Sequence, residues 1–459
     1  MCGIVGGFGD NVENGVSALL HRGPDAQGIV KIGNLTLGHT RLAILDLDQR
    51  SNQPFVYGRV SLVFNGEIWN YKTIRDLLKA EGKQFQTEGD TEVLAAALDT
   101  WGVDALLKLQ GMFAIAWTMD GETLFLARDR FGEVPLHIAK QKPFCFASEK
   151  KALQAMGCHP KSFDDVQPGT YLEVTRSRLQ AHTYYDLPVT RSKDNRGQAS
   201  ANVYRLIGDG STERTISDVP VCTLLSGGID SAAVAYWLKK SFPDLVAYTA
   251  VYNTRSTDLR SARMVAESLG IELREVKIPH PSPSDLSRVI RTIEMDYKAQ
   301  IEIGWPCLIL AERMKADGFK VTYSGEGSDE LWASYGFAYY ALQTQDWRQY
   351  RKELFLTQAR KNFVRCNKIF MGHSIECRLP FLNTGLVEYA ISLSTEAVQD
   401  GKSKPKAVIQ NAFAGLLPDY ITNRAKVAFQ DGLGLKDAIA RTLPDPLRFY
   451  RTEYANIYG

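Results

Sequence analysis

The sequence lacks the features that mark membrane, secreted and nucleic-acid-binding proteins. No stretch approaches the roughly 18 uncharged apolar residues of a membrane span, and the start, MCGIVGGFGD, has no basic segment followed by an apolar one. Lys and Arg number 54 against 52 acidic residues, and no long basic run occurs. We therefore expect a cytoplasmic protein with neither a membrane nor a nucleic acid among its partners.

Cysteine is also scarce and unpaired in the sequence. The 7 cysteines include no CxxC pair, which argues against a disulfide framework and against a structural zinc site. There is no internal repeat or low-complexity tract. A chain of 459 residues exceeds the roughly 250 to 300 residues at which single cores stop growing, so two large domains are expected. A homodimer is compatible with these features.

The first part of the chain reads as short strands, Gly-rich turns and two amphipathic helices. Residues 34–45 and 58–66 have strand-like apolar patterns, whereas residues 73–82 and 91–109 have apolar residues at helical spacing. Helices of this kind can cover the faces of sheets. The pattern predicts an α+β domain of layered sheets and helices.

A polar, Pro-containing stretch without apolar periodicity follows Glu173 and predicts a domain boundary near residue 190. We expect domains at 2–190 and 191–459. Residues 219–240 then form an apolar run, an SGG turn and a long helical pattern, and further strands are expected at 245–252 and 319–325. This order predicts a doubly wound α/β domain with a mostly helical C-terminal part.

Cys2 follows the initiator methionine directly. Because cysteine is small, we expect Met1 to be removed, which leaves a thiol and a free α-amine on one residue. An amine with a pKa near 8 can accept the thiol proton directly or through water. Such a residue could act as a nucleophile without a histidine, although a cysteine at position 2 alone is also compatible with an incidental thiol.

Two loops follow predicted strands and predict a nucleotide site. The first is SGGIDS, residues 226–231, and the second is SGEGSDE, residues 324–330. Backbone amides and a helix N-terminus at such a turn can bind phosphate, and the P-loop lysine is absent. Asp230 and Asp329 come from the ends of two strands and could share Mg²⁺ on the phosphates of ATP.

The motifs together resemble the glutamine-hydrolysing asparagine synthetase family. The N-terminal ones are HRGPD from His21, RLAILDL from Arg41, NGEIWNY from Asn65, EGDTEV around Asp90, then GMFAIAW, ARDRFGEVPLH and FASEKKAL. They are similar to class II glutamine amidotransferases, whose glutaminase domain is an N-terminal-nucleophile fold. The two loops and NRAKVAFQDGLG resemble an ATP-pyrophosphatase domain that forms adenylated intermediates.

The resemblance implies roles for the glutaminase residues, beginning with Cys2 as the catalytic nucleophile. Arg41 would bind the carboxylate of glutamine, and Glu67 and Asp90 its ammonium group. Asn65 and the Gly66 amide would form the oxyanion hole. Each also has a structural interpretation: Arg41 as a surface ion pair, Asn65-Gly66 as a hairpin turn and Asp90 as a helix cap.

For the synthetase half, the resemblance implies that Glu326 accepts a proton from attacking ammonia and that Lys426 neutralises charge on the α-phosphate. The stretch 376–382 would support the site. The residues expected to contact ATP are Leu224, Ser226, Gly227, Gly228, Asp230, Ser231, Val251, Ser324, Gly325 and Lys406.

We therefore predict an ATP-dependent amidotransferase that aminates a carboxylate, with aspartate as the first candidate. Glutamate, asparagine, AMP and pyrophosphate would be its products. Asn383, Gln410 and the segment LWASY at 331–335 depart from the family pattern. They keep open another carboxylate acceptor, whereas Cys2 argues against a lactam-forming synthetase. A non-catalytic binding protein is disfavoured because Cys2, Asp230, Asp329 and Lys426 are all present.

Overall fold

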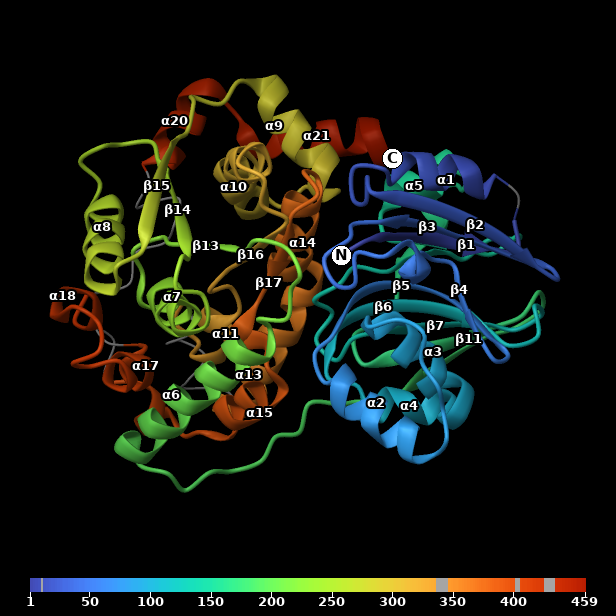
Figure 1. Cartoon of the computed structure of the whole chain (residues 1–459). Helices are drawn as coiled ribbons and strands as arrows, with labels where there is room; N and C mark the ends of the chain where they lie inside the picture. Colours follow the sequence, from blue (N-terminus) through green and yellow to red (C-terminus); the bar gives the residue numbers. More distant parts are fainter. Residues whose placement is uncertain (10, 336–345, 401–404, 425–433) are drawn as a thin grey trace.

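The computed structural model describes residues 1–9, 11–335, 346–400, 405–424 and 434–459. The chain forms two lobes, with the N-terminal residues in one and the residues after about 195 in the other (Figure 1). The last helix, α21 (Pro446–Tyr458), returns to the first lobe, where Tyr454 accepts a hydrogen bond from Lys150 at 3.2 Å. Both ends of the chain therefore lie near the boundary between the lobes.

The N-terminal lobe contains two six-stranded sheets in which all neighbouring strands are antiparallel. The first has the order β10-β8-β9-β1-β3-β2, with β1 (Gly3–Gly7), β2 (Ala26–Ile32), β3 (Leu35–Arg41), β8 (His137–Ala139), β9 (Cys145–Ala147) and β10 (Phe163–Asp165). The second has the order β12-β11-β7-β6-β5-β4, with β4 (Phe55–Tyr57), β5 (Val60–Ile68), β6 (Gly111–Thr118), β7 (Leu124–Arg128), β11 (Thr170–Val174) and β12 (Leu179–Thr183).

Helices cover the outer faces of both sheets (Figure 1). Helices α1 (Val12–Ala18) and α5 (Lys150–Ala155) lie on the first sheet, and α2 (Tyr71–Ala80), α3 (Asp90–Trp101) and α4 (Ala105–Lys108) lie on the second. Short 3₁₀ turns are η1 (Gln49–Ser51), η2 (Gly102–Asp104) and η3 (Pro160–Ser162). The four layers confirm the α+β prediction.

Alternating side chains on the central strands point into two different cores, one between the two sheets and one between each sheet and the helices that cover it. On β1, Ile4 faces the core between the sheets, and its neighbour Val5 packs under α1 and α5. On β5, Val63 lies between the sheets while Phe64 packs against α2 and α3. Because successive side chains of a strand point to opposite faces, strands buried on both faces read as nearly continuous apolar runs.

The predicted helix at 91–109 is wrong as a single element. Helix α3 ends at Trp101, η2 begins at Gly102, and α4 covers only Ala105–Lys108. Glycine is the residue that most readily leaves helical geometry. The apolar periodicity of the sequence therefore continues past a glycine at which the α-helix itself ends. The prediction of two helices also missed α1 and α5.

The C-terminal lobe contains parallel strands in the order β15-β14-β13 and β16-β17, and a parallel bridge between Val221 and Val321 joins the two groups. The strands are β13 (Cys222–Leu224), β14 (Val246–Val251), β15 (Glu272–Lys277), β16 (Val321–Tyr323) and β17 (Glu376–Arg378). The order reverses between β13 and β16, where open sheets of this type bind ligands.

Helices lie on both sides of this sheet, with α7 and α8 on one side and α10 on the other (Figure 1). The helices up to residue 371 are α6 (Arg196–Glu213), α7 (Ile229–Ser241), α8 (Thr257–Leu269), α9 (Pro283–Ile293), α10 (Lys298–Ala316), α11 (Ser328–Leu331), α13 (Trp347–Leu356), η4 (Thr357–Arg360) and α14 (Asn362–Met371). After them come η5 (Pro380–Leu382), α15 (Thr384–Ser392), α16 (Thr395–Val398), α17 (Ala407–Ala412), α18 (Asp419–Thr422) and α20 (Leu435–Thr442). The doubly wound α/β prediction is confirmed.

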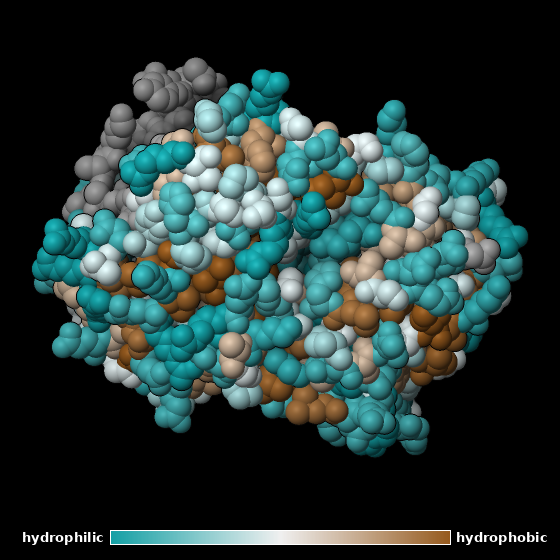
Figure 2. All heavy atoms as spheres, turned by 90° about the horizontal axis from the view of Figure 1, so that it is seen from above, coloured by the Kyte–Doolittle hydropathy of each residue, from teal (hydrophilic) through white to brown (hydrophobic). Residues whose placement is uncertain are grey.

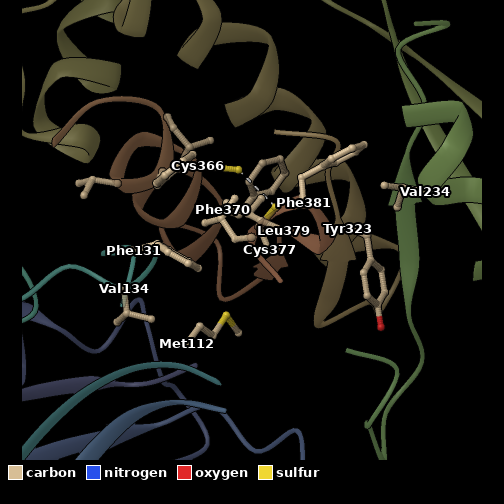
Figure 3. Close-up of a cluster of buried hydrophobic side chains, with 14 of the residues drawn as sticks. Met112, Phe131, Val134, Val234, Tyr323, Cys366, Phe370, Cys377, Leu379 and Phe381 are labelled. Carbon is tan, nitrogen blue, oxygen red and sulfur yellow. Dashed lines mark hydrogen bonds between the residues drawn. The ribbon is translucent and has the colours of Figure 1, made fainter. Parts of the chain in front are cut away.

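Apolar side chains of both lobes pack into one continuous core (Figure 3). Phe131 and Val134 of the first lobe face Phe370 and Leu379 of the second. The segment between β12 and α6 has no helix or strand, and the predicted boundary at residue 190 falls within it. The boundary remains a prediction. The apolar contact shows that the two lobes pack against each other and are not joined by the linker alone.

The outer surface is largely hydrophilic, and its apolar side chains gather in separate patches on the face shown in Figure 2. Exposed large apolar residues such as Leu20, Val56 and Leu447 are distributed over both lobes. Among the described helices, none has both the length and the apolar character that crossing a membrane requires.

Candidate active sites

Cys2 lies just before β1 and is buried at the boundary between the lobes. Its backbone N–H donates to Asn65 Oδ1 at 2.8 Å, and burial raises the pKa of its thiol despite the nearby terminal amine. Met1 is present and buried, with its amine paired to Glu376. In this form the nitrogen of Cys2 is a peptide amide, so the expected role as base requires the removal of Met1.

Asn65 and Gly66 lie within β5, and not in a hairpin turn. Gly66 pairs with Phe113 of β6 and has φ of 153°. A Cβ atom at this position would lie 2.0 Å from the carbonyl oxygen of Met112, so no other residue fits without moving the neighbouring strand. The backbone at Asn65-Gly66 is thus fixed beside Cys2, where the oxyanion hole is predicted.

Arg41 ends β3 and is buried, which excludes the surface ion pair considered from sequence. Its Nη1 donates to the carbonyl of Asp48 at 2.8 Å and to Asn52 Oδ1 at 2.7 Å, and its Nη2 donates to the carbonyl of Asp46. The loop after β3 therefore fixes the plane of the guanidinium without neutralising its charge. A positive group of this kind can bind a carboxylate.

Glu67 and Asp90 form a buried acidic pair near Cys2. Asp90 is the first residue of α3 and does not cap it; its carboxylate accepts from the Ile68 amide at 2.9 Å. Burial raises the pKa of Asp90 to about 6. Burial, and then the carboxylates of Glu376 and Asp90, raise the pKa of Glu67 well above its usual value. The pair is suited to bind a cationic group.

Several residues of this site were not assigned from sequence. Arg22 of the HRGPD motif donates from Nε to the carbonyl of Cys2 at 2.9 Å. Glu376 and Arg378 of β17 were interpreted as support for the synthetase site, but they lie against the first lobe: Glu376 pairs with the Met1 amine and Arg378 stacks over Trp69. Their separation from Cys2 along the chain gave no local signal for this contact.

The second site lies where the strand order reverses. The loop after β13 leads into α7, which begins at Ile229, and the loop after β16 leads into α11. Gly325 of the second loop approaches the first so closely that a Cβ atom would lie 2.9 Å from the Ser231 amide nitrogen. Ser328 of α11 donates to Asp230 Oδ1 at 2.6 Å. The two predicted loops therefore form one site.

Lys406 lies between the two predicted metal ligands. Its ammonium pairs with Asp230 and with Asp329, so both carboxylates converge on a single cation. Burial alone would lower the pKa of Lys406, but the two carboxylates raise it above its usual value. Among the described residues no larger His, Cys, Asp and Glu cluster suits a metal. Two carboxylates with phosphate oxygens are a donor set that fits Mg²⁺.

Glu326 follows Gly325 and pairs with Arg365 of α14, with Nη2 and Oε2 2.5 Å apart. This partner excludes simple helix capping as its only role. Arg365 is 3% exposed, and its Nε and Nη1 atoms have no hydrogen-bond partner among the described atoms. The guanidinium therefore has donors left for a group that enters beside Glu326.

A cavity of about 830 Å³ joins these features. The predicted residues in its lining are Leu224, Ser226, Gly228, Asp230, Ser231, Ser324, Gly325, Glu326, Asp329 and Lys406. Of the predicted ATP contacts, Gly227 and Val251 are not in that lining, although Ala250 is. Gly227 instead packs under α8. Lys426 lies outside the residues that the structure describes.

Comparison with known proteins assigns both halves of the chain. Residues 1–191 match the glutamine amidotransferase domain, and residues 202–363 and 343–448 match asparagine synthase. The chain is 29% identical over 481 residues to asparagine synthetase B (glutamine-hydrolyzing) of Escherichia coli (strain K12), covering 97% of this chain and 86% of that one. It is 30% identical over 475 residues to asparagine synthetase (glutamine-hydrolyzing) 3 of Arabidopsis thaliana, covering 95% and 79%.

The chain belongs to the asparagine synthase family. It is an ATP-dependent ligase that performs glutamine-dependent amidation, with a glutamine amidotransferase domain followed by an asparagine synthase domain. Among solved structures, the glutamine phosphoribosylpyrophosphate amidotransferase from B. subtilis aligns with a TM-score of 0.37 and 18% identity over 63% of this chain and 78% of that one. This likeness is too distant to bear on the chemistry.

The departures from the asparagine synthase pattern have identifiable structural roles. Asn383 caps α15 by accepting from the Leu386 amide at 2.9 Å. Gln410 donates to the carbonyl of Arg424 at 3.1 Å and lines the cavity. In the LWASY segment, Ser334 donates to Asp329 at 2.6 Å and Tyr335 to Glu330 at 2.6 Å. Two departures thus lie at the cavity and bear on what it binds.

Proposed function

We propose that this chain is a glutamine-hydrolysing asparagine synthetase. Glutamine would be hydrolysed at Cys2, and the ammonia would pass within the protein to an acyl-adenylate formed from the aspartate side chain and ATP. Glutamate, asparagine, AMP and pyrophosphate would result. The observation that carries the proposal is the convergence of Asp230 and Asp329 on the Lys406 ammonium beside Glu326.

In the glutaminase step, the free amine of processed Cys2 would take the proton of its own thiol, which then attacks the carboxamide carbon. The side-chain amide of Asn65 and the backbone amide of Gly66 would hold the oxyanion. The buried guanidinium of Arg41 supports binding of the glutamine carboxylate, and the acidic pair Glu67 and Asp90 supports binding of its ammonium.

In the synthetase step, the loop from Ser226 to Ser231 and Ser324-Gly325 would bind the phosphates of ATP. Asp230 and Asp329 would hold Mg²⁺, which neutralises charge on the phosphate oxygens when bound. Lys406, whose ammonium already lies between these two carboxylates, would then bind a phosphate of ATP. Lys426 would serve the α-phosphate, and Glu326 would accept the proton that ammonia loses on attack.

The part of the cavity beyond Glu326 supports an acceptor that carries a second carboxylate. Arg365 and Lys361 line it, together with the amide side chains of Gln300 and Asn362. Aspartate offers one carboxylate for adenylation and another for a guanidinium such as that of Arg365. Tyr335 and Gln410 in the same cavity make another dicarboxylic acceptor the second candidate.

The first test separates the two nitrogen sources. Cys2→Ala should abolish product formation with glutamine while ammonium salts still support it, because only the release of ammonia needs the thiol. Glutamate and amide product are measured with each source. Equal loss with both sources would contradict two separate sites.

The second test addresses the acceptor and the nucleotide products. Wild-type enzyme is incubated with glutamine and ATP, with and without aspartate, and asparagine, pyrophosphate, AMP and ADP are quantified. Aspartate-dependent pyrophosphate and asparagine are expected. Release of ADP and phosphate would contradict adenylation, whereas glutamate release without asparagine would redirect the search to other carboxylates.

A further inference from the structure

Helix α14 carries polar side chains into both sites. Arg365 contacts Glu326 at 2.5 Å, and Asn362 donates to Glu330 of α11 at 2.8 Å, so both serve the synthetase lobe. Asn367 instead accepts a hydrogen bond from Arg22 of the glutaminase lobe at 3.0 Å. Residues two positions apart lie about 200° apart around an α-helix, which explains how Arg365 and Asn367 reach opposite sides.

Arg22 connects Asn367 to the predicted nucleophile. Its side chain is fully buried, and each of its three nitrogens has a different partner. Nε donates to the Cys2 carbonyl at 2.9 Å, Nη1 to Glu149 at 2.7 Å and Nη2 to Asn367 at 3.0 Å. Because a guanidinium is rigid and planar, its partners on Nη1 and Nη2 fix where Nε points.

We propose that Asn367, a residue of the synthetase lobe, is a positioning residue for the glutaminase nucleophile. By holding Nη2 of Arg22, it fixes the hydrogen bond that Arg22 makes to the Cys2 carbonyl, and so the place of the thiol relative to Asn65 and Gly66. The neighbouring residues Cys366 and Phe370 pack in the apolar core between the lobes, which keeps α14 in place (Figure 3). This inference rests on the proposed role of Cys2.

The test compares two replacements of similar size. Asn367→Leu fills the volume without an acceptor, and Asn367→Asp keeps an oxygen for Arg22. The leucine variant should lower kcat for glutamine hydrolysis about 10-fold or more, since it removes a hydrogen bond to a charged group. KM for glutamine should change little because Arg41, Glu67 and Asp90 remain. Synthesis from ammonium should stay within about twofold of wild type, and the aspartate variant should recover most of kcat.

Asn362→Leu on the same helix is the matched control. It should show the reverse pattern, with impaired synthesis from ammonium and normal glutamine hydrolysis, since its contact is with Glu330. If Asn367→Leu does not fold, Asn367→Ser replaces it in the comparison with Asn367→Asp, because the serine side chain is too short to reach Arg22.

Three outcomes would overturn the inference. They are a wild-type kcat in the Asn367 variant, an equal loss of both activities with a lowered Tm, and the absence of recovery in Asn367→Asp. A wild-type enzyme that releases no glutamate from glutamine would instead refute the proposed function, and this inference with it.

Discussion

Asp90 shows how a single side chain acquires a property that its position in the sequence hides. At the start of a helix, an aspartate would normally cap exposed amides and titrate near its usual value. Here Gly89 is the capping residue, and the Asp90 carboxylate turns to the Ile68 amide of β5. The side chain is thereby buried beside Glu67 and not at the helix surface.

We predict that glutamine hydrolysis depends on the ionisation of Asp90. Burial raises its pKa to about 6, so the carboxylate that would bind the ammonium of glutamine is lost as the pH falls through 6. Because kcat/KM reports the free enzyme, loss of the Asp90 carboxylate should make it fall about tenfold for each pH unit well below 6. Glutamate release measured from pH 5 to 8 checks this.

Asp90→Asn is the control for that profile. It should have low kcat/KM throughout and no inflection near pH 6. A wild-type profile that stays flat down to pH 5 would show that the ionised carboxylate is not required.

At the scale of elements, the nucleotide loop is shaped by packing against the next helix. Gly227 has φ of 80°, and a Cβ atom there would lie 2.3 Å from the Asp258 carbonyl oxygen at the start of α8. Arg424 links the loop to α8, because it donates a hydrogen bond to the Gly227 carbonyl at 3.1 Å and pairs with Asp258. The loop therefore depends on α8 as well as on its own strand and helix.

We predict that Gly227→Ala removes ATP binding but not glutamine hydrolysis. The left-handed backbone alone should cost about 1 to 2 kcal/mol for alanine, and the clash with Asp258 must displace the loop. Calorimetric ATP titration and urea unfolding measure the two effects.

The matched variant is Gly318→Ala, which has φ of 87° and no atom within 4 Å of the added Cβ. It should lose similar backbone stability and bind ATP normally. ATP affinity that is equal in the two variants would refute the packing argument.

Local patterns predicted several of the buried strands, among them β5 and β14. Strand β14, buried throughout, was expected, whereas β15 was not, because this edge strand has the polar sequence ELREVK and only one of its six residues is buried. For the sites, the residues around Cys2 and the two nucleotide loops were predicted from short motifs. Contacts such as Arg22 with Asn367 join residues 345 positions apart, and only the packing of the lobes reveals them.

At the scale of the whole molecule, a buried polar cluster joins the lobes beside the shared core. Glu294, at the end of α9, accepts from the backbone amides of Lys150 and Lys151 at 2.8 Å each and pairs with Lys368 of α14. Lys368 also donates to His137 Nε2 at 3.0 Å. Burial, and then the charge of Lys368, lower the pKa of His137 to about 4, so the ring is neutral and can accept this bond.

We predict that Lys368→Met destabilises the whole chain by about 3 to 5 kcal/mol, because it leaves the buried carboxylate of Glu294 without the lysine with which it forms an ion pair. In the wild type, burial favours protonation of Glu294, but Lys368 and Lys151 hold its pKa at about 2, so its contribution is lost only as the pH falls from about 4.5 toward 2. Without Lys368 the folded pKa should rise above the unfolded value. The folded variant then binds a proton that the unfolded chain does not. The loss in its free energy of unfolding relative to wild type should therefore grow as the pH rises from 5 to 8.

Urea unfolding at pH 5 and pH 8 measures this deficit, with two variants for comparison. Lys368→Met combined with Glu294→Gln removes the unpaired charge and should recover much of the loss. Lys352→Met breaks another lysine–carboxylate pair between the lobes, with Asp186 at 2.8 Å, but that partner is 74% exposed, so the cost should stay below about 1 kcal/mol at either pH.

Because the apolar core crosses the boundary, all variants should unfold in one transition with both lobes lost together. Similar losses for Lys368→Met and Lys352→Met, or a Lys368→Met deficit that does not change with pH, would show that Glu294 is not held ionised by Lys368.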